Sequence, residues 1–367
     1  MRLQELEISQ YRNIGLLTLT CPEELHLFVG ENAQGKTNIV ESLYVLSLAK
    51  SHRTRATKDL IQFGKPFSKL KAKVKKGDQL IRLEVQLNEK GKKAIRNGLE
   101  QPKLSHYIGT MPTILFAPED LAIVKGSPQI RRRFLDTEIG QVSPTYLYQL
   151  NQIQKVLHQR NAILKNGMQK ELLEVLNEQF LSLSIQIWKK RYYFIDLLLK
   201  WAQPIHETIT GGKECLQIEY LPSVPIQREM DEDQIRAITT RELARLESQE
   251  WRRGSTLIGP QRDDFRLKNG ELDLHNFGSQ GQQRTAALSL KLAEIELIYQ
   301  ETGFYPLLLL DDVLSELDDH RKTQLLEAIR GKVQTFVTTT SLEGIHQDTL
   351  QRAKIYRVEQ GNVTVQG

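Results

Sequence analysis

The sequence lacks long apolar runs and is poor in cysteine. No run reaches the ~18 residues that a membrane-spanning helix needs, and residues 1–7 alternate with charges, unlike a signal peptide. The two cysteines, Cys21 and Cys215, lack metal-ligand spacing. We therefore expect a cytoplasmic protein with no membrane partner, no disulfide framework and no cysteine-ligated metal.

The chain is also short of aromatic residues and, in one stretch, of acids. Aromatic side chains make up 7% of the residues and form no run suited to stacking on nucleic-acid bases. Between Lys50 and Lys76, Asp59 is the only acid among ten lysines and arginines. This excess suits a polyanion such as DNA, although a solvated loop face explains it equally well. The DNA-binding residues that we expect are Arg53, Arg55, Lys58, Lys71 and Lys73.

What the sequence does contain is a phosphate-binding loop. Residues 30–37 match the pattern G-x-x-x-x-G-K-[ST], after a strand-like apolar run (25–29) and before apolar residues at helical spacing. The glycines let backbone N–H groups point at an anion, and the following helix adds positive charge. We expect Lys36 to hold the β- and γ-phosphates and the Thr37 hydroxyl to bind Mg²⁺. The cofactor-binding residues predicted here are Gly30, Glu31, Asn32, Ala33, Gln34, Gly35, Lys36 and Thr37.

Two carboxylates follow another apolar run. Residues 307–310 are four leucines, typical of a buried parallel strand, and Asp311 and Asp312 come directly after them. Ligands of open α/β sheets lie beyond the carboxyl ends of the strands. We therefore expect Asp311 to bind Mg²⁺ opposite Thr37, and Asp312 to be the base for an attacking water. The alternative is that the two acids cap the next helix.

A second glycine motif opens another helix. Residues 278–284 read Gly-Ser-Gln-Gly-Gln-Gln-Arg, with Ser279 placed as the N-cap. Taken alone, this motif indicates only an ordinary helix cap. Along the chain, however, the phosphate loop comes first, this Ser-Gln-Gly-Gln motif second, and the apolar strand with its acids third. This order makes Ser279, Gly281 and Gln282 candidates for phosphate contact.

The distribution of strand and helix signals predicts one core interrupted by an insertion. Strand-like segments lie on both sides of the phosphate loop and its helix within residues 3–117, with a type I′ hairpin turn predicted at Asn97–Gly98. Residues 118–253 are mostly helical, and strand–helix alternation resumes from 254. We predict an α/β fold with a core of residues 1–117 and 254–367 (lobe I), split by a helical insertion, 118–253 (lobe II). The insertion is too short for an extended coiled coil.

This ensemble resembles the ABC-type P-loop ATPase heads of the SMC/Rad50 class and, more specifically, the RecF family of bacterial recombinational repair proteins. The motifs that carry the resemblance are Gly30–Asn38, Ser51–Thr54, Arg131–Asp136, Gln159–Asn161, Gly259–Asp264 and Leu310–Asp318. The resemblance implies a two-lobed head that binds ATP and Mg²⁺ and forms an ATP-induced homodimer. Ser279 and the N–H groups after Gly281 of a second subunit would complete the phosphate site. Lys36, Asp312 and Ser279 would then be catalytic.

The same resemblance implies binding to duplex and gapped DNA, a weak DNA-stimulated ATPase that acts as a switch, and cooperation with RecR and RecO in loading RecA at gaps. Some positions depart from the family pattern. Ala33 replaces a common glycine, which costs little if its φ is negative, and Gln261 stands where histidine is expected. Asp312 replaces the glutamate of the wider ABC class. Residues 338–340 are threonines at the place of the switch histidine.

Other functions stay open at this point. One is an SMC-like structural head, and another is the ABC-type ATPase subunit of a different complex, such as a transporter. A third is a nuclease-coupled ATPase, although no further acidic cluster follows Asp318 in the sequence. A fourth is a nucleotide-gated DNA clamp in which hydrolysis is incidental.

Overall fold

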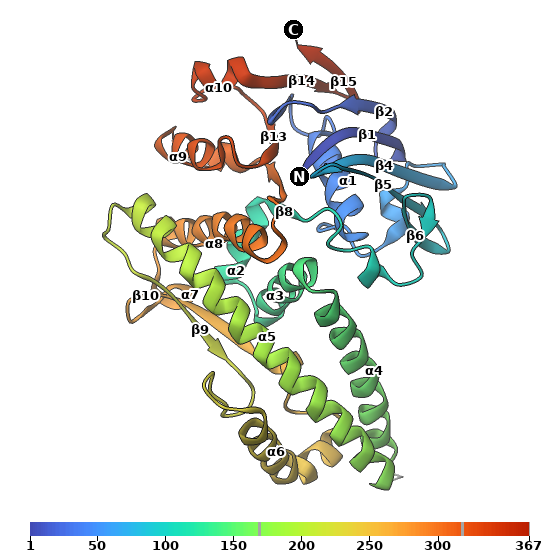
Figure 1. The fold of residues 1–367 in the computed structure, drawn as a ribbon, viewed down its shortest axis with the longest axis vertical. Helices are drawn as coiled ribbons and strands as arrows, with labels where there is room; N and C mark the ends of the chain where they lie inside the picture. The colour runs from blue at the N-terminus through green and yellow to red at the C-terminus, as the bar shows by residue number, and fades with distance from the viewer. Residues whose placement is uncertain (168–169, 317–318, 367) are drawn as a thin grey trace. The chain divides into compact units, whose positions relative to one another are not determined.

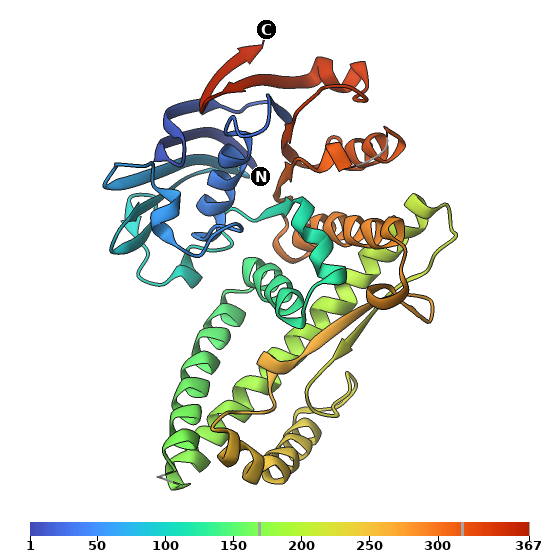
Figure 2. The same cartoon turned by 180° about the vertical axis from the view of Figure 1, so that it is seen from behind.

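The computed structural model describes residues 1–167, 170–316 and 319–366 (Figures 1 and 2). Its contacts group the chain into two compact units: unit 1 is Met1–Asp120 with Glu294–Gly367, and unit 2 is Leu121–Ala293. Our prediction placed residues 254–293 in the core lobe, whereas the contacts place them in unit 2. In the described residues no helix is both long enough and apolar enough to span a bilayer.

Unit 1 contains a six-stranded sheet in the order β15-β14-β3-β13-β12-β8. All neighbouring strands are parallel except the antiparallel β14–β15 hairpin. Continuous apolar runs form the central strands because both faces of a parallel sheet are covered. The strands are β3 (Leu25–Val29), β8 (Thr113–Phe116), β12 (Leu307–Asp311), β13 (Gln334–Thr339), β14 (Ala353–Glu359) and β15 (Asn362–Gln366).

A second, antiparallel sheet of unit 1 has the order β2-β1-β4-β5-β6-β7. Its strands alternate buried and exposed residues, as expected for a sheet with one face on the core. Asn97 and Gly98 have φ angles of 52° and 82°, which confirms the predicted type I′ turn. The strands are β1 (Arg2–Tyr11), β2 (Ile14–Thr20), β4 (Phe67–Lys76), β5 (Gln79–Asn88), β6 (Gly91–Arg96) and β7 (Leu99–Glu100).

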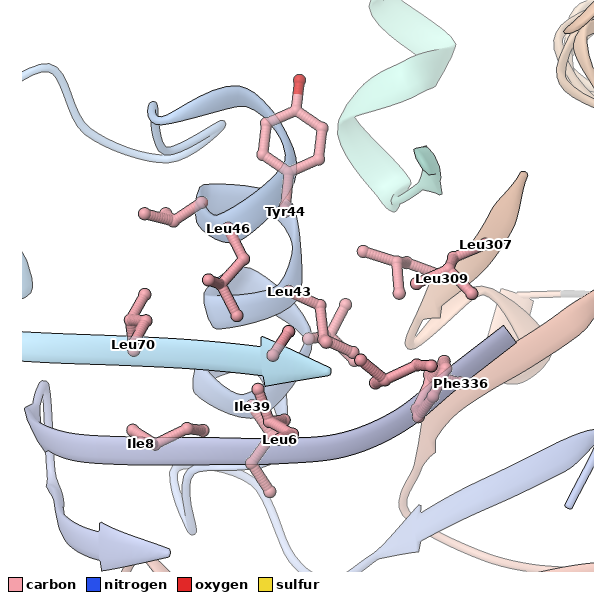
Figure 3. Close-up of a cluster of buried hydrophobic side chains, with 14 of the residues drawn as sticks. Leu6, Ile8, Ile39, Leu43, Tyr44, Leu46, Leu70, Leu307, Leu309 and Phe336 are labelled. Carbon is pink, nitrogen blue, oxygen red and sulfur yellow. The ribbon is translucent and has the colours of Figure 1, made fainter. Parts of the chain in front are cut away.

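Helix α1 (Lys36–Leu48) is the centre of the unit 1 core. It contacts strands of both sheets, so nearly all its residues are buried and it has no strongly polar face. Figure 3 shows Ile39, Leu43 and Leu46 of this helix among side chains from both sheets. The packing fixes the start of α1, and with it the phosphate loop, against the sheets. Unit 1 also contains α9 (Asp319–Ile329) and α10 (Gln347–Arg352), the latter not predicted.

Unit 2 is helical with one small antiparallel sheet, β11-β10-β9. The antiparallel pair α4 and α5 forms its longest arm (Figure 1), and α8 continues from unit 2 into unit 1. Helix α6 begins with a capping box between Asp231 and Gln234. The strands are β9 (Leu216–Leu221), β10 (Asp264–Asn269) and β11 (Leu272–Asp273). The helices are α2 (Ala122–Lys125), α3 (Pro128–Val142), α4 (Pro144–Asn166), α5 (Lys170–Thr210), α6 (Glu232–Arg253), α7 (Leu274–Phe277) and α8 (Gln280–Thr302).

A buried charged cluster explains why residues 254–293 belong with unit 2. Arg191 of α5 donates to the carbonyl oxygen of Pro260 at 2.7 Å and to Asp263 Oδ2 at 3.0 Å. Trp188 Nε1 donates to the same carboxylate at 2.8 Å. Burial raises the pKa of Asp263, and the Arg191 charge opposes that rise. Together with the full-length pairing of β10 and β9, this cluster ties the Gly259–Asp264 motif to the long helix.

Candidate nucleotide-binding site

The phosphate loop connects the end of β3 to the first turn of α1. Gly35 is the N-cap of α1 at φ 111°, with no side-chain hydrogen bond capping the helix. An uncapped helix N-terminus presents N–H groups to an anion. The local geometry is therefore that of the predicted loop, with backbone donors at the carboxyl edge of the parallel sheet.

The backbone at Ala33 differs from what we expected. Its φ is 64°, so the assumption of a negative φ is wrong. In this left-handed region a Cβ atom crowds the following carbonyl oxygen, and a glycine would adopt the conformation without that cost. The loop therefore holds strain at a residue that lines the expected phosphate position.

Lys36 is the one cation inside the loop. The residue is 6% exposed, and Nζ donates to the carbonyl oxygens of Gly30 at 2.6 Å and Glu31 at 2.8 Å. Burial lowers the pKa of Lys36, and the charges of Asp312 and Asp311 oppose that shift. The ammonium group is held by neutral carbonyls, which a phosphate oxygen can replace.

Thr37 and Asp311 meet as predicted from their places in the sequence. Thr37 Oγ1 donates to Asp311 Oδ1 at 2.9 Å. The same carboxylate oxygen accepts from Thr338 Oγ1 at 2.6 Å, so the strand between β3 and β12 also supports it. Hydroxyl and carboxylate oxygens are ligands that Mg²⁺ prefers, and this donor set fits the ion. The supporting role of Thr338 was missed, because nothing in the sequence signals a contact across strands.

Asp312 has an unusual backbone and a fixed side chain. Its φ is 56°, its N–H donates to Thr338 Oγ1 at 2.9 Å, and its Oδ1 accepts from Ser315 Oγ at 2.7 Å. Aspartate adopts the left-handed conformation far more readily than most residues, which gives a physical reason for Asp rather than Glu here. Of the expected motif that follows Asp312, Leu317 and Asp318 lie outside the described residues.

The second glycine motif lies in unit 2. Ser279 is exposed, its N–H donates to Gln282 Oε1 at 2.9 Å, and its Oγ accepts from the Gln282 N–H at 3.2 Å. These reciprocal bonds form a capping box, so the predicted cap is present. Gly281 lies between them and leaves the first turn of α8 without a side chain at that position.

The five predicted DNA-binding residues lie in three different surroundings. Lys71 and Lys73 of β4 pair with Glu7 and Glu5 of β1, at 2.8 and 2.5 Å, which reduces the positive charge of this face. Arg55 and Lys58 are exposed in the irregular segment after α1.

Arg53 lies at the nucleotide site rather than on the β4 face. Its Nη1 donates to Asn38 Oδ1 at 3.1 Å, and Asn38 is in the first turn of α1. The segment is anchored by Ser51 Oγ, which donates to the fully buried Glu41 at 2.5 Å, and Glu41 also pairs with Arg12 at 2.8 Å. This anchoring places Arg53 beside the N-terminus of α1. The charge pattern alone had assigned this arginine to DNA binding.

A groove of 680 Å³ lies beside the phosphate loop within unit 1. Gly30, Glu31 and Gln34 form one wall, and residues of the β14–β15 hairpin form the other. Apart from Val358 and Gln360, the hairpin residues that line it alternate along the strands and belong to one face of the hairpin. They are Arg357, Glu359, Asn362, Thr364 and Gln366.

Known proteins are similar to this chain over nearly its whole length. The family model of the RecF/RecN/SMC N terminal domain matches residues 2–364. A protein of Oceanobacillus iheyensis called DNA replication and repair protein RecF is 50% identical over 368 residues, covering 99% of this chain and 100% of that protein. A protein of the same name from Lysinibacillus sphaericus is also 50% identical, covering 99% of each.

The chain is also similar to solved structures of RecF and of an Smc head. A structure of the recombination mediator protein RecF-ATPrS in the RecFOR pathway has a TM-score of 0.92 and 32% identity, covering 100% of this chain and 98% of that one. A structure of an Smc head bound to the C-winged helix domain of ScpA has a TM-score of 0.57 at 15% identity, which shows a shared fold. The predicted fold class, an ABC-type head of α/β architecture, is thereby confirmed. The chain belongs to the RecF family of DNA replication and repair proteins.

Proposed function

We propose that this protein binds DNA in an ATP-dependent manner during replication and recombinational repair. ATP and Mg²⁺ bind in unit 1, two copies associate through the bound ATP, and slow hydrolysis releases them. The observation that carries the proposal is the cluster of Lys36, Thr37, Asp311 and Asp312 at the carboxyl ends of β3 and β12. The curated relatives and the RecF-ATPrS structure support it by their names.

Each residue of the cluster has a distinct role in this proposal. The Lys36 ammonium and the loop N–H groups hold the phosphates, and Thr37 and Asp311 hold Mg²⁺. Asp312 orients the attacking water, and its bond from Ser315 Oγ fixes the carboxylate for that purpose. The magnesium ion would neutralise charge on the phosphates and orient them for attack.

In this proposal, dimerisation depends on the exposed N-terminal cap of α8. Ser279 and the first turn of α8, with Gly281 and Gln282, contact the γ-phosphate held by the other subunit. ATP then stabilises the dimer by mass action, and loss of the γ-phosphate weakens it. The dimer is therefore the state in which both phosphate sites are complete.

DNA binding would use the exposed cations Arg55 and Lys58 from both subunits, with a smaller part for the ion-paired Lys71 and Lys73. Contacts to phosphates make binding independent of sequence and sensitive to salt, with a slope of about −0.9 per neutralised phosphate. Binding at gapped DNA, stimulation of hydrolysis by DNA, and cooperation with RecR, RecO and RecA complete the proposal by family resemblance. The two free cysteines, Cys21 and Cys215, fit a cytoplasmic location.

Sedimentation velocity with and without ATP, Mg²⁺ and duplex DNA tests the proposal. The wild-type chain should sediment as a dimer only with ATP, and DNA should co-sediment with that dimer. Lys36→Ala should abolish the ATP-dependent dimer, because the phosphates lose their only side-chain cation in the loop. An ATP-dependent dimer of unchanged affinity in Lys36→Ala would contradict the proposal.

Ser279→Ala separates binding from dimerisation. This variant should bind ATP as the wild type does, yet dimerise and hydrolyse poorly. Because Ser279 also caps α8, Ser279→Asp serves as the matched control, since aspartate keeps the cap but repels the phosphate. Wild-type turnover in both variants would rule out the contribution of a second subunit.

A further inference from the structure

The tight turn near the C-terminus contacts the phosphate loop from outside. Gln360 and Gly361 have φ angles of 47° and 82° and connect the paired residues Glu359 and Asn362, so they form a two-residue type I′ turn. Both central N–H groups of this turn donate to one residue, Gln34. Gln360 N–H donates to Gln34 Oε1 at 2.7 Å, and Gly361 N–H donates to the Gln34 carbonyl oxygen at 2.8 Å.

These contacts fix the orientation of one peptide group in the loop. The Gln34 carbonyl oxygen also accepts from Asn13 Nδ2, at 3.2 Å, so two donors hold it on the side of the hairpin. In a planar trans peptide the carbonyl and the following N–H point in opposite directions. The peptide between Gln34 and Gly35 is trans, so its Gly35 N–H points away from the hairpin, where the phosphate loop must present its donors.

Close packing leaves room only for glycine at two of these positions. A Cβ atom on Gly361 would lie 2.4 Å from the Asn13 carbonyl oxygen, and one on Gly35 would lie 2.8 Å from the Asn13 amide. Both glycines also have positive φ angles, 82° and 111°. Asn13, the phosphate loop at Gly35 and the turn at Gly361 are thus packed too closely to admit a further carbon atom at either glycine.

We propose that the Gln360–Gly361 turn and Gln34 are positioning elements of the nucleotide site. The turn holds the Gln34 carbonyl outward and so aims the Gly35 N–H at the bound phosphate. The proposal rests on the proposed binding of ATP at this loop. It adds that the C-terminal hairpin, more than 300 residues from the loop in sequence, determines the affinity for ATP.

Two glycine variants at the same kind of turn test this. Gly98 occupies the matching position of the other type I′ turn, with the same φ of 82°, and a Cβ there would meet nothing within 4 Å. Gly361→Ala and Gly98→Ala therefore impose similar turn strain, but only the Cβ atom of Gly361→Ala would clash with Asn13 and so push the turn away from Gln34. Isothermal titration of the full chain with ATP should show Kd raised about tenfold for Gly361→Ala, the effect of one misplaced donor, and unchanged for Gly98→Ala.

The results distinguish this inference from the proposed function. If the wild type fails to bind ATP, the proposed function is wrong. If the wild type binds ATP and the two glycine variants have the same Kd, the hairpin has no positioning role and this inference is overturned.

A second variant keeps the test decisive if Gly361→Ala does not fold. Gln34→Met keeps the length of the side chain but removes the acceptor of the Gln360 N–H. Its loss of ATP affinity should be non-additive with Gly361→Ala where that variant folds, and additive with Gly98→Ala, because only coupled residues share the effect.

Hydrogen exchange gives an independent readout. ATP should slow amide exchange at Gln360 and Gly361 in the wild type, leave Gly98 unchanged, and lose its effect on the turn in Gln34→Met. Equal exchange at the turn with and without ATP would contradict the inference.

Discussion

The Arg191 cluster of unit 2 and the phosphate site of unit 1 bury charge in opposite ways. In unit 2, Arg191 is 1% exposed and pairs directly with the equally buried Asp263. In unit 1, Lys36 and Asp311 are each 6% exposed, but their hydrogen-bond partners are neutral, namely loop carbonyls for the cation and threonine hydroxyls for the anion. A charge held by neutral groups can exchange them for a ligand of opposite charge, whereas a buried ion pair has no such freedom. The Arg191–Asp263 cluster of unit 2 therefore uses charge for structure, as the pair of Arg12 with the buried Glu41 in unit 1 also does, whereas the phosphate loop of unit 1 uses charge for binding.

Backbone strain follows the same division. Among the described residues, every non-glycine residue with positive φ lies in unit 1, and three of them, Ala33, Asp312 and Gln360, belong to the phosphate loop or contact its surroundings. Strained conformations tend to cluster at functional sites, where the surrounding contacts hold them.

Removing the central cation of unit 2 should destabilise that unit and leave nucleotide binding in unit 1 unchanged. Arg191→Met leaves Asp263 buried without its charge partner, so we expect a loss of ~4 kcal/mol in the free energy of unfolding. All three tryptophans, Trp188, Trp201 and Trp251, lie in unit 2, so their fluorescence in urea reports on it. Arg236→Met, which removes an exposed ion pair with Glu178, is the control and should cost less than ~1 kcal/mol. If both variants lowered the free energy of unfolding equally, the buried Arg191–Asp263 pair would have no special structural role.

Replacing the Asp312 carboxylate of unit 1 should lower ATP turnover and leave the stability of the fold unchanged. Asp312→Asn keeps the shape and the hydrogen bond from Ser315 but cannot accept a proton from water, so turnover of ATP should fall about a hundredfold. ATP-dependent dimerisation and DNA binding should remain. Phosphate release and sedimentation measure the two properties separately. Unchanged turnover would place the catalytic base elsewhere, and simultaneous loss of dimerisation would assign Asp312 to binding.

A buried histidine should make the stability of unit 1 depend on pH. His26 is stacked on Phe336 with ring centroids 4.7 Å apart, and burial lowers its pKa to about 4 from the ordinary 6.5. Between these values the unfolded chain binds more protons than the folded one, so stability falls as pH falls, by ~2 kcal/mol from pH 7 to pH 5. Hydrogen exchange of β3 and β13 amides measures the change. His26→Phe should remove this dependence, and a retained slope would assign it to another group.

Relieving strain in the phosphate loop should give the smallest effect. Ala33→Gly should stabilise unit 1 by about 1 kcal/mol, because glycine accepts a φ of 64° without steric cost. Ala49, at the C-cap of α1 with φ 50°, is the matched control outside the loop and should respond similarly. Calorimetric melting of both variants checks this. Destabilisation by Ala33→Gly would mean that the loop is not strained at that residue.

The sequence predicted most elements of the fold for identifiable reasons. The continuous leucines predicted β12, and the Asn97–Gly98 dipeptide predicted the hairpin turn. The assignment of residues 254–293 followed from strand and helix signals alone and differs from the contacts. The pairing of β10 with β9 and the burial of Asp263 against Arg191 join segments more than 40 residues apart, and no local pattern reports such contacts.

At the candidate site, too, the sequence predicted local motifs but not the contacts between distant segments. The motif patterns predicted Lys36, Thr37, Asp311 and the cap at Ser279, because each needs only a fixed local spacing. The negative φ assumed for Ala33 was wrong, since the backbone of a loop depends on what surrounds it. The charge count grouped Lys71 and Lys73 with Arg53, although acids on a neighbouring strand pair with the lysines.

The sequence by itself determined the chemistry of this protein: a phosphate loop, two acids after an apolar strand, and a capped glycine helix, each encoded by residues close together in the chain. Only the tertiary structure decided which neutral groups hold the charges, and that the turn at Gln360 and Gly361 supports Gln34. The reason is that hydrogen bonds between distant segments depend on the packing of whole sheets, which no short stretch of sequence specifies.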